Sequence, residues 1–395
     1  MNAPDESRLV AVVLPAPEAA VAIRATWDQG GAVAVVDPAD PNHRERLEHL
    51  APTHVIDAHG EHRFPAGRGV ASDVGAVVAT SGTTGDARFV ELTVDGLRAS
   101  ALAVHHALDV HPDRDRWLAC LPLHHIAGLA IVARGYFTET ALTVHPRFDP
   151  TAIARDAESA TLISLVPTTL RRLLDTHPSA LAQFRRVLVG GGPIAHDLHT
   201  AATDAGVAVV STYGLTETGG GCVHDGHALT GADIAVPGAP GEPGEILVRG
   251  PVLMRGYRAS AGDGAATNSL DPAGWFATGD IGVLDATDRL TVVDRIKDLI
   301  ITGGVNVSPI AIETQLATAT GVADVAVVGV EDAEWGQRVV ACVVPTDSTT
   351  PPTLAALRDA GRAAGLRAAE LPRELRFVAT IPRTPGGKII RTRLR

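Results

Sequence analysis

The stretch VGAVVATSGTTGDARFVEL, residues 74–92, combines an apolar strand pattern with a turn rich in glycine and hydroxyl groups. The run 74–80 is apolar and β-branched, which is typical of a strand buried on both faces. The turn supplies three hydroxyl residues and two glycines: Ser81, Gly82, Thr83, Thr84 and Gly85. The glycines let backbone N–H groups converge on a ligand, so the loop suits a pyrophosphate, although no Walker A ending GK[ST] follows. Alone, such a sequence is more often an ordinary turn.

Three more apolar runs, at 161–167, 186–191 and 207–212, predict further buried strands. Helical patterns lie between them. In VPTTLRRLLDTH, Pro167 marks a helix start, and Leu170, Leu173 and Leu174 share one face. Strands that alternate with helices favour an α/β fold with a mainly parallel sheet. Because the loops rich in glycine and hydroxyl groups directly follow these strands, we expect a ligand site at the carboxyl ends of the strands.

The sequence pattern changes near residue 236. The segment PGAPGEPGEILVRGPVLMRGY is rich in glycine and proline and contains one short strand, which predicts a small barrel or a sheet extension. After the strand RLTVVDR (289–295), the last roughly 100 residues combine two helices with three strands, which fits a small α+β domain. We predict a large domain over 1–295 and a small C-terminal domain over 296–395.

The composition indicates a cytoplasmic protein of the size of an enzyme. Of the 395 residues, 45% are hydrophobic and 20% are charged, which suits soluble globular domains. The net charge of −11 disfavours general binding to nucleic acid or to a membrane surface. We see neither a signal peptide nor an apolar run long enough to span a bilayer. The three cysteines lie far apart without zinc-site spacing, which favours a reducing compartment. The sequence leaves open whether the protein forms a homo-oligomer.

Lysine is nearly absent from this chain. Lysine and arginine total 34, yet only Lys297 and Lys388 are lysines. A bias this strong reflects genome composition, and it makes the two remaining lysines informative. Lysine and arginine are not interchangeable where a compact charge is needed. For Lys388, which stands just after a glycine pair near the C-terminus, the simpler interpretation is a solvated tail.

Several motifs after the predicted strands carry chemistry. In STYGLTETGGG (211–221), Tyr213 could stack on a flat ring, Thr216 could donate to a phosphate and Glu217 could hold Mg²⁺. A surface turn with a helix cap explains the same residues. In WFATGDIGVLD (275–285), Asp280 could accept hydrogen bonds from both ribose hydroxyls, or simply follow a turn. His125 is a weak candidate for the wall of a pocket. The sequence near it contains no second cluster of metal-ligating residues, so a metal site is not expected there.

Weak individually, these motifs stand in a specific order. Seven of them run in one direction through residues 80–391, about four-fifths of the chain: TSGTTGxx(K/R), LPLxH, GGxP, YGxTE, TGD, DRxKDxIxxGGxNVxPxxIE and RTxxGKxxR. The series resembles the adenylate-forming superfamily, which contains acyl-CoA synthetases, firefly-luciferase-like enzymes and adenylation domains of peptide synthetases. The resemblance implies a large α/β domain of mainly parallel sheets that binds ATP and an acid, a small barrel-like subdomain, and a small mobile α+β C-terminal domain.

The resemblance also implies a two-step ligase. A carboxylate first attacks the α-phosphorus of ATP, giving an acyl-adenylate and pyrophosphate. A thiol, normally that of coenzyme A, then displaces AMP. By motif matching, the loop 80–88 would hold the β- and γ-phosphates, and Glu217 would hold the Mg²⁺ cofactor. The nucleotide-binding residues implied are Thr80, Ser81, Gly82, Thr83, Thr84, Gly85, Arg88, Gly192, Tyr213, Gly214, Thr216, Asp280 and Arg295.

The C-terminal motifs assign catalysis and domain motion. Lys388 would bridge the attacking carboxylate and the α-phosphate in the first step only. A charge that arrives for one step stabilises that transition state selectively. Lys297 matches the hinge on which the small domain would swing, and Gly303 and Gly304 would line the passage for CoA. The catalytic residues implied are Lys388, Thr216 and Glu217.

Position 88 departs from the family pattern, because the usual Pro-Lys is Ala87-Arg88 here. Arginine keeps the positive charge and can donate two hydrogen bonds to phosphate oxygens. In a chain with only two lysines, we interpret the change as a tolerated substitution, and the sequence leaves open whether the bulkier guanidinium costs turnover.

Two segments, SLVPTTLRRLLD and TYGLTETGGGCVHDGHAL, resemble the o-succinylbenzoate–CoA ligases of menaquinone biosynthesis. That resemblance implies an acid site formed by His125, Ser164, Thr168, Gly219 and Gly220. The acid has two carboxylates, so we expect a cation in the pocket, but the sequence does not identify the arginine that supplies it. Two alternatives stay open: a ligase for another aryl or short-chain acid, and a nucleotide-binding protein without activity, which Arg88 suggests.

Overall fold

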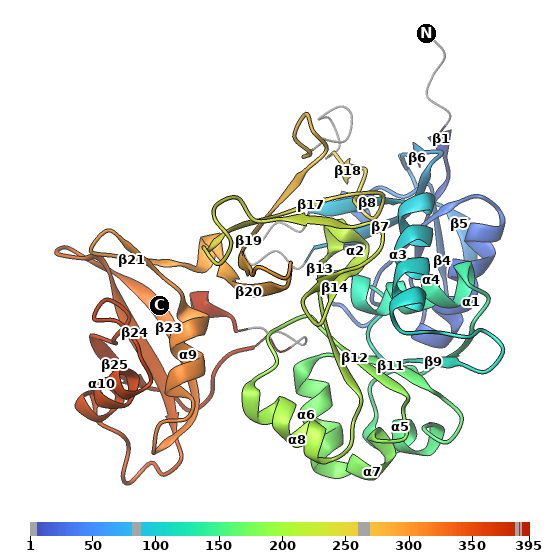
Figure 1. Cartoon of the computed structure of the whole chain (residues 1–395). Helices are drawn as coiled ribbons and strands as arrows, with labels where there is room; N and C mark the ends of the chain where they lie inside the picture. Colours follow the sequence, from blue (N-terminus) through green and yellow to red (C-terminus); the bar gives the residue numbers. More distant parts are fainter. Residues whose placement is uncertain (1–5, 81–87, 260–268, 384–386, 388) are drawn as a thin grey trace. The chain divides into compact units, whose positions relative to one another are not determined.

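In the computed structural model, residues 6–80, 88–259, 269–383, 387 and 389–395 are described. The chain forms two compact units, one of residues 1–234 with 248–276 and one of residues 235–247 with 277–395. Figure 1 shows the course of the chain through both units. The domain boundary predicted after Arg295 stays a prediction, and so does the mobility of the C-terminal domain.

The first sheet of the larger unit carries most of the predicted strands. Its seven strands have the order β10-β9-β11-β12-β13-β14-β15 among the described residues. The first five run parallel, and β14 and β15 add an antiparallel edge. The bounds are β9 Arg116–Ala119, β10 Ala141–Val144, β11 Leu162–Leu165, β12 Arg186–Val189, β13 Val209–Leu215, β14 Gly220–His224 and β15 His227–Ala228.

The second sheet of this unit has the order β18-β8-β7-β3-β2-β4-β5. Its strands β7, β3, β2 and β4 run parallel, whereas β8, β18 and β5 are antiparallel to their neighbours. The bounds are β2 Leu9–Val12, β3 Ala32–Val35, β4 His54–Asp57, β5 Gly60–Arg63, β7 Val74–Ala79, β8 Phe89–Thr93 and β18 Gly256–Tyr257. A separate pair joins β1 Glu6–Ser7 to β6 Val70–Ala71. The expected α/β fold of mainly parallel sheets is confirmed.

Helices cover both faces of the first sheet (Figure 1). On one face, α3 Val94–Ala107 and α4 Ile126–Phe137 pack over a core that contains Trp117 and Leu162. On the other face, Ile163 contributes to a second core beneath α5 Pro150–Asp156, α6 Pro167–Thr176, α7 Pro178–Leu181 and α8 His196–Asp204. Leu162 and Ile163 serve opposite cores because successive strand residues point to opposite faces. Beside the second sheet lie α1 Ala16–Asp28 and α2 His43–Leu50.

The segment rich in glycine and proline contributes one strand, β17, to a four-stranded sheet of order β16-β17-β19-β20. Its bounds are β16 Asp233–Ala235, β17 Gly244–Arg249, β19 Phe276–Leu284 and β20 Leu290–Arg295. The C-terminal region adds the five-stranded sheet β22-β21-β24-β23, with β25 beside β24. These elements are β21 Ile300–Thr302, β22 Val305–Val307, β23 Val322–Asp332, β24 Gly336–Pro345, β25 Glu374–Phe377, α9 Pro309–Leu316 and α10 Leu354–Ala363. The predicted two helices and three strands of this region are confirmed, and β21 and β22 are additional.

Cys120, Cys222 and Cys342 are buried and unpaired. Among the described residues, no helix has both the length and the apolar character needed to cross a membrane.

Candidate active site

Four neighbouring parallel strands end where the sequence motifs begin. His125 caps α4 after β9, Thr168 stands in the first turn of α6 after β11, Gly192 follows β12, and Thr216 follows β13. The strands β9, β11, β12 and β13 are adjacent and parallel. Their carboxyl ends therefore meet at one edge of the sheet, where ligands bind in such folds. The structure thus brings these segments, distant in sequence, to one place.

The YGLTE motif differs locally from its expected form. Tyr213, Gly214 and Leu215 were expected in a loop, but they belong to β13, which continues to Leu215 with an irregularity at Tyr213/Gly214. A Cβ on Gly214 would overlap the carbonyl oxygen of Gly220, so only glycine allows β14 this close. The strand is longer because pairing with β14 satisfies its backbone groups.

The catalytic motif ends in a short 3₁₀ helix, η1 Thr216–Thr218. The Thr218 hydroxyl donates 2.6 Å to the Gly220 carbonyl and accepts 2.9 Å from the Leu215 N–H, which fixes the turn. Gly219 ends it at φ 63°, the left-handed region that favours glycine. This turn holds Thr216 and Glu217 at the strand end, so their nucleotide and metal roles stay reasonable predictions.

Glu217 has a partner that the motifs did not indicate. The Tyr257 hydroxyl donates to Glu217 Oε1 at 2.8 Å, and the Arg88 guanidinium lies 3.6 Å from the centre of the Tyr257 ring. Burial and the Glu217 charge raise the pKa of Tyr257, so the hydroxyl stays protonated. The chain Arg88–Tyr257–Glu217 therefore links the second sheet to the end of β13.

The turn between β7 and β8 lies only partly within the described residues. The Thr80 N–H donates 2.8 Å to the Arg88 carbonyl, so these two residues close the antiparallel pair. The residues predicted to hold the phosphates lie outside the described residues: Ser81, Gly82, Thr83, Thr84 and Gly85. Their phosphate role stays a prediction.

A buried arginine lies beside the predicted acid site. Arg134, from the last turn of α4, is 4% exposed, and its Nη1 donates 3.3 Å to Ser164 Oγ. Its guanidinium also lies 5.0 Å from the Trp117 ring centre, and its Nε has no hydrogen-bond partner. Among the described residues no carboxylate pairs with it. Burial lowers the pKa of Arg134 to about 10, so the group remains charged near neutral pH.

Further unpartnered polar atoms lie on β13 and β14. Thr212 and His224 stand opposite each other on β13 and β14. The Thr212 hydroxyl and both ring nitrogens of His224 are buried without hydrogen-bond partners. Gly221 stands beside them, since a Cβ there would overlap the Thr212 hydroxyl. Buried polar groups in folded proteins are normally hydrogen-bonded, so this cluster calls for water or a polar ligand.

The smaller unit contains the predicted ribose contacts. Asp280 and Arg295 stand opposite each other on β19 and β20, and Arg295 Nε lies 2.8 Å from Asp280 Oδ1. The TGD motif sits inside β19 and not after a free turn, with Gly279 at φ 72°. Lys297 follows in the short helix η2 Ile296–Asp298. The structure thus joins Asp280 to Arg295, while the ribose and hinge roles stay predictions.

The glycine pair predicted to line the CoA passage has a local explanation. Gly303 and Gly304 form the two-residue turn between β21 and β22, at φ 57° and 78°. Such hairpin turns need positive φ at both positions, which glycine provides. The CoA role of this pair stays a prediction. Lys388 lies outside the described residues.

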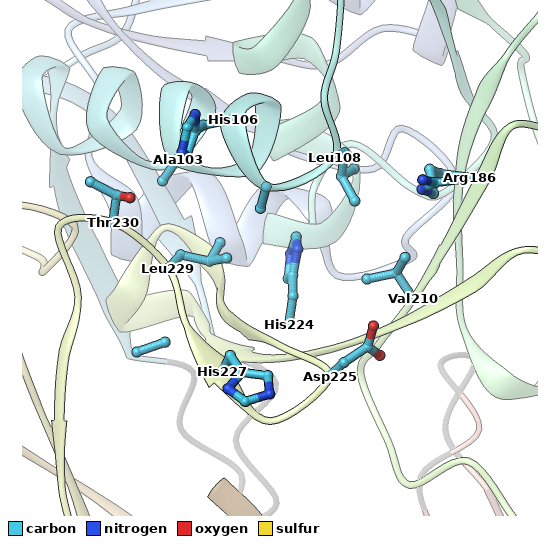
Figure 2. Close-up of a pocket in the computed structure, with 12 residues that line it drawn as sticks. Ala103, His106, Leu108, Arg186, Val210, His224, Asp225, His227, Leu229 and Thr230 are labelled. Atoms are coloured by element: carbon cyan, nitrogen blue, oxygen red, sulfur yellow. The ribbon is translucent and has the colours of Figure 1, made fainter. Parts of the chain in front are cut away.

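A pocket of the larger unit lies away from the strand ends. It has a volume of about 450 Å³ and lies beside α3, β14 and β15 (Figure 2). Arg186 begins β12 and lines it together with His106, His224, Asp225 and His227. The pocket therefore opens near the amino end of β12, and the end of the segment TYGLTETGGGCVHDGHAL, from His224 to Leu229, forms part of its wall. None of the predicted site residues lines it.

Two family models match the sequence of this chain. A family model described as AMP-binding enzyme matches residues 61–258, and one described as AMP-binding enzyme C-terminal domain matches residues 311–388. The chain belongs to the AMP-binding enzyme family. The first match covers the motifs of the larger unit, from β5 to β18, and the second covers most of the C-terminal sheet.

Relatives of this AMP-binding enzyme include a probable 2-succinylbenzoate–CoA ligase from Mycobacterium tuberculosis. It is 40% identical over 340 residues, which cover 83% of this chain and 85% of that protein. A feruloyl-CoA synthase from an Amycolatopsis species is 32% identical over 408 residues, covering 93% and 79%. The solved o-succinylbenzoate CoA synthetase from Bacillus subtilis, in complex with its acyl-adenylate intermediate, has a TM-score of 0.85 at 27% identity and covers 99% and 88%. Its complex with ATP and magnesium has a TM-score of 0.84 at 26% identity and covers 98% and 89%.

The donor atoms of this AMP-binding enzyme suit a magnesium ion carried by a nucleotide. Glu217 offers a carboxylate at the strand end, held by the Tyr257 hydroxyl. Among the described residues, no group of three or more histidine, cysteine or acidic side chains could hold a metal ion alone. Magnesium usually binds through one or two carboxylates together with substrate phosphates, so this arrangement fits it.

Sequence analysis missed two residues of this site, Arg134 and Tyr257. Arg134 is the one charged residue in the apolar helix IAGLAIVARGYF (126–137), a signal that could have indicated a buried functional cation. Tyr257 had no comparable signal, because a tyrosine that follows a glycine in a segment rich in glycine and proline does not by itself indicate a function.

Two buried histidines predict how stability depends on pH. Burial, assisted by the Arg134 charge, lowers the pKa of His105 and of His224 to about 4, from 6.5. Below pH 6.5 the unfolded chain therefore binds protons that the folded chain does not, so stability falls as pH falls. Between pH 6.5 and 5 we expect a loss of about 1–2 kcal/mol per histidine in the free energy of unfolding, measured by urea titration. A His224→Leu variant should lose part of this slope, and an unchanged slope would contradict the assignment.

Proposed function

We propose that this chain is an ATP-dependent carboxylate–CoA ligase that forms an acyl-adenylate, with o-succinylbenzoate as the acid. The products would be o-succinylbenzoyl-CoA, AMP and diphosphate, in menaquinone biosynthesis. The relatives and the solved structures support the reaction type, since their names describe this activity. Three buried, unpaired cysteines are consistent with a cytoplasmic location.

The observation that carries the choice of acid is the buried Arg134. A buried cation without a carboxylate partner is unfavourable unless a ligand supplies the opposite charge. Arg134 contacts Ser164, which the sequence motifs assign to the acid site. We assign Arg134 to the second carboxylate of the acid, with Ser164 beside it. An acid with one carboxylate would leave this cation unpaired.

The remaining roles follow from the positions at the strand ends. Tyr213 and Gly192 would pack on adenine, and Thr216 would donate to the α-phosphate. Mg²⁺, held by Glu217 and the nucleotide phosphates, would neutralise charge on the leaving diphosphate. Asp280 and Arg295 would bind the ribose, and Lys388 would place a positive charge at the attacking carboxylate. His125, Thr168, Gly219 and Gly220 would line the acid site.

A second candidate is a ligase for another aryl acid, such as ferulate, because a feruloyl-CoA synthase is also similar over most of the chain. This candidate offers no partner for Arg134, because ferulate carries a single carboxylate. The structure therefore favours a dicarboxylate.

A panel of acids tests the proposal. Purified protein is incubated with ATP, Mg²⁺, CoA and one acid at a time, and AMP is measured. We expect o-succinylbenzoate to exceed ferulate and benzoate by about 10²-fold in kcat/KM, because those acids leave a buried charge unpaired. Faster turnover of ferulate would refute the choice of acid. Failure of all acids in diphosphate exchange, with ATP still bound, would support a protein without activity.

A further inference from the structure

Tyr257 contacts two parts of the site that the motifs treat as separate. Its hydroxyl donates 2.8 Å to Glu217 Oε1, at the end of β13. Its ring lies under the guanidinium of Arg88, at 3.6 Å from the ring centre. The Arg88 carbonyl in turn accepts a hydrogen bond from the Thr80 N–H. One side chain therefore joins the start of β8 to the predicted metal ligand.

The backbone around Tyr257 is held firmly. Tyr257 itself is 8% exposed and pairs with Val90 across β18 and β8. The neighbouring Arg258 is buried and donates to the carbonyls of Leu50, Arg68 and Gly69. These hydrogen bonds leave the segment little freedom to shift, because any shift would break at least one of them.

The same segment is also hydrogen-bonded to the backbone of the η1 turn. The Met254 N–H donates 2.7 Å to the carbonyl of Glu217. Glu217 is thus fixed once through its main chain and once through its carboxylate. A carboxylate held in one rotamer before the metal arrives loses less conformational entropy on binding, which strengthens binding.

The arginine at position 88 fits this arrangement better than a lysine would. A planar guanidinium stacks on an aromatic face, whereas an ammonium is a compact and strongly hydrated charge. The contact with Tyr257 therefore gives a physical reason why the family's usual lysine can be replaced here.

We propose that Tyr257 is a positioning residue for the nucleotide-bound magnesium, because its hydroxyl fixes Glu217 while its ring anchors Arg88 beside the phosphate loop. This inference rests on the proposed function for the magnesium role of Glu217. It adds a residue that the motifs do not contain and predicts a defect specific to the metal.

The test measures nucleotide binding by calorimetry, without turnover. The whole protein is titrated with α,β-methylene-ATP, once with Mg²⁺ and once with EDTA. For Tyr257→Phe, which keeps the ring and removes the hydroxyl, we expect the gain in affinity from Mg²⁺ to shrink about tenfold. Affinity in EDTA should match that of the wild type. Tyr136→Phe is the matched control, because it removes a hydroxyl that donates 2.9 Å to the exposed Asp28 carboxylate.

Several results would overturn the inference. A full Mg²⁺ gain in Tyr257→Phe would do so, and so would equal losses with Mg²⁺ and with EDTA, which indicate general damage. Wild-type binding that ignores Mg²⁺ would overturn both this inference and the magnesium role. If no acid is activated while Tyr257→Phe still shows the specific defect, the ligase proposal fails and the positioning role stands.

A second pair of variants tests the role of the Tyr257 ring separately from that of its hydroxyl. Arg88→Lys is made once with Tyr257 present and once in a Tyr257→Leu background. We expect it to weaken Mg²⁺-nucleotide binding roughly threefold more with Tyr257 present, because the stacking contact exists only with the ring. Equal effects of Arg88→Lys in both backgrounds would show that the two side chains are not coupled and would contradict the anchoring role.

Discussion

Replacing Arg134 with methionine is expected to lower kcat/KM for o-succinylbenzoate by about 10²–10³-fold. Removing one partner of a buried, hydrogen-bonded charge pair costs about 2–5 kcal/mol, and each 1.4 kcal/mol corresponds to tenfold. The loss should fall mainly on acid binding, since Arg134 lies away from the strand ends where the nucleotide residues gather. Steady-state kinetics with varied acid at saturating ATP measures it. A matched keto acid that lacks the ring carboxylate should react equally with wild type and variant.

The same substitution should not harm the fold. A buried charge without a carboxylate partner destabilises the protein before substrate binds, and a hydrophobic side chain of similar length is often neutral or stabilising. We expect Arg134→Met to leave the free energy of unfolding unchanged or to raise it by about 1–3 kcal/mol. Arg258→Met is the contrasting control, because the Arg258 side chain, which is 4% exposed, is paired with Glu91 and donates to four backbone carbonyls. That variant should be destabilised. Loss of stability in Arg134→Met with activity retained would contradict the assigned role.

Replacing Lys388 with alanine is expected to reduce adenylate formation by about 10²–10³-fold, the usual effect of removing one donor that stabilises transition-state charge. Thioester formation from supplied acyl-adenylate should stay near the wild-type rate, because the lysine is assigned to the first step only. Acid-dependent exchange between diphosphate and ATP measures the first step, and release of AMP from the adenylate with CoA measures the second.

Arg393→Ala is the control for this prediction. It removes an exposed positive charge five residues further along the chain, outside the proposed machinery. Its rates should match those of the wild type in both steps. Equal losses in both steps for Lys388→Ala would instead indicate a structural role and would remove the assignment.

The candidate site illustrates what local pattern reveals. Thr216 and Glu217 follow a strand that the sequence predicted, so their placement at its end followed from periodicity and motif order, whereas the strand before His125, β9, was not predicted. Asp280 and Arg295 were separate candidates, and the register of β19 and β20 then placed them together. Gly303 and Gly304 show the opposite case, because a two-residue hairpin explains them without any ligand.

Arg134 and Tyr257 could not be found in the same way. Arg134 meets Ser164 across 30 residues, and Tyr257 meets Glu217 across 40. Neither contact has a spacing that a motif could capture, because each depends on how a helix or an edge strand packs on a sheet. The extension of β13 to Leu215 likewise depends on its pairing with β14.

The amino-acid order alone determined the class of fold, three of the four strands that carry the site and the residue types at their ends. Apolar period, glycine position and charge are local properties, and they act wherever the chain lies. Only the tertiary structure decided which cation is buried without a partner and which hydroxyl holds the acidic ligand. Both depend on burial and on contacts between segments far apart, which arise only when the sheets and helices pack together.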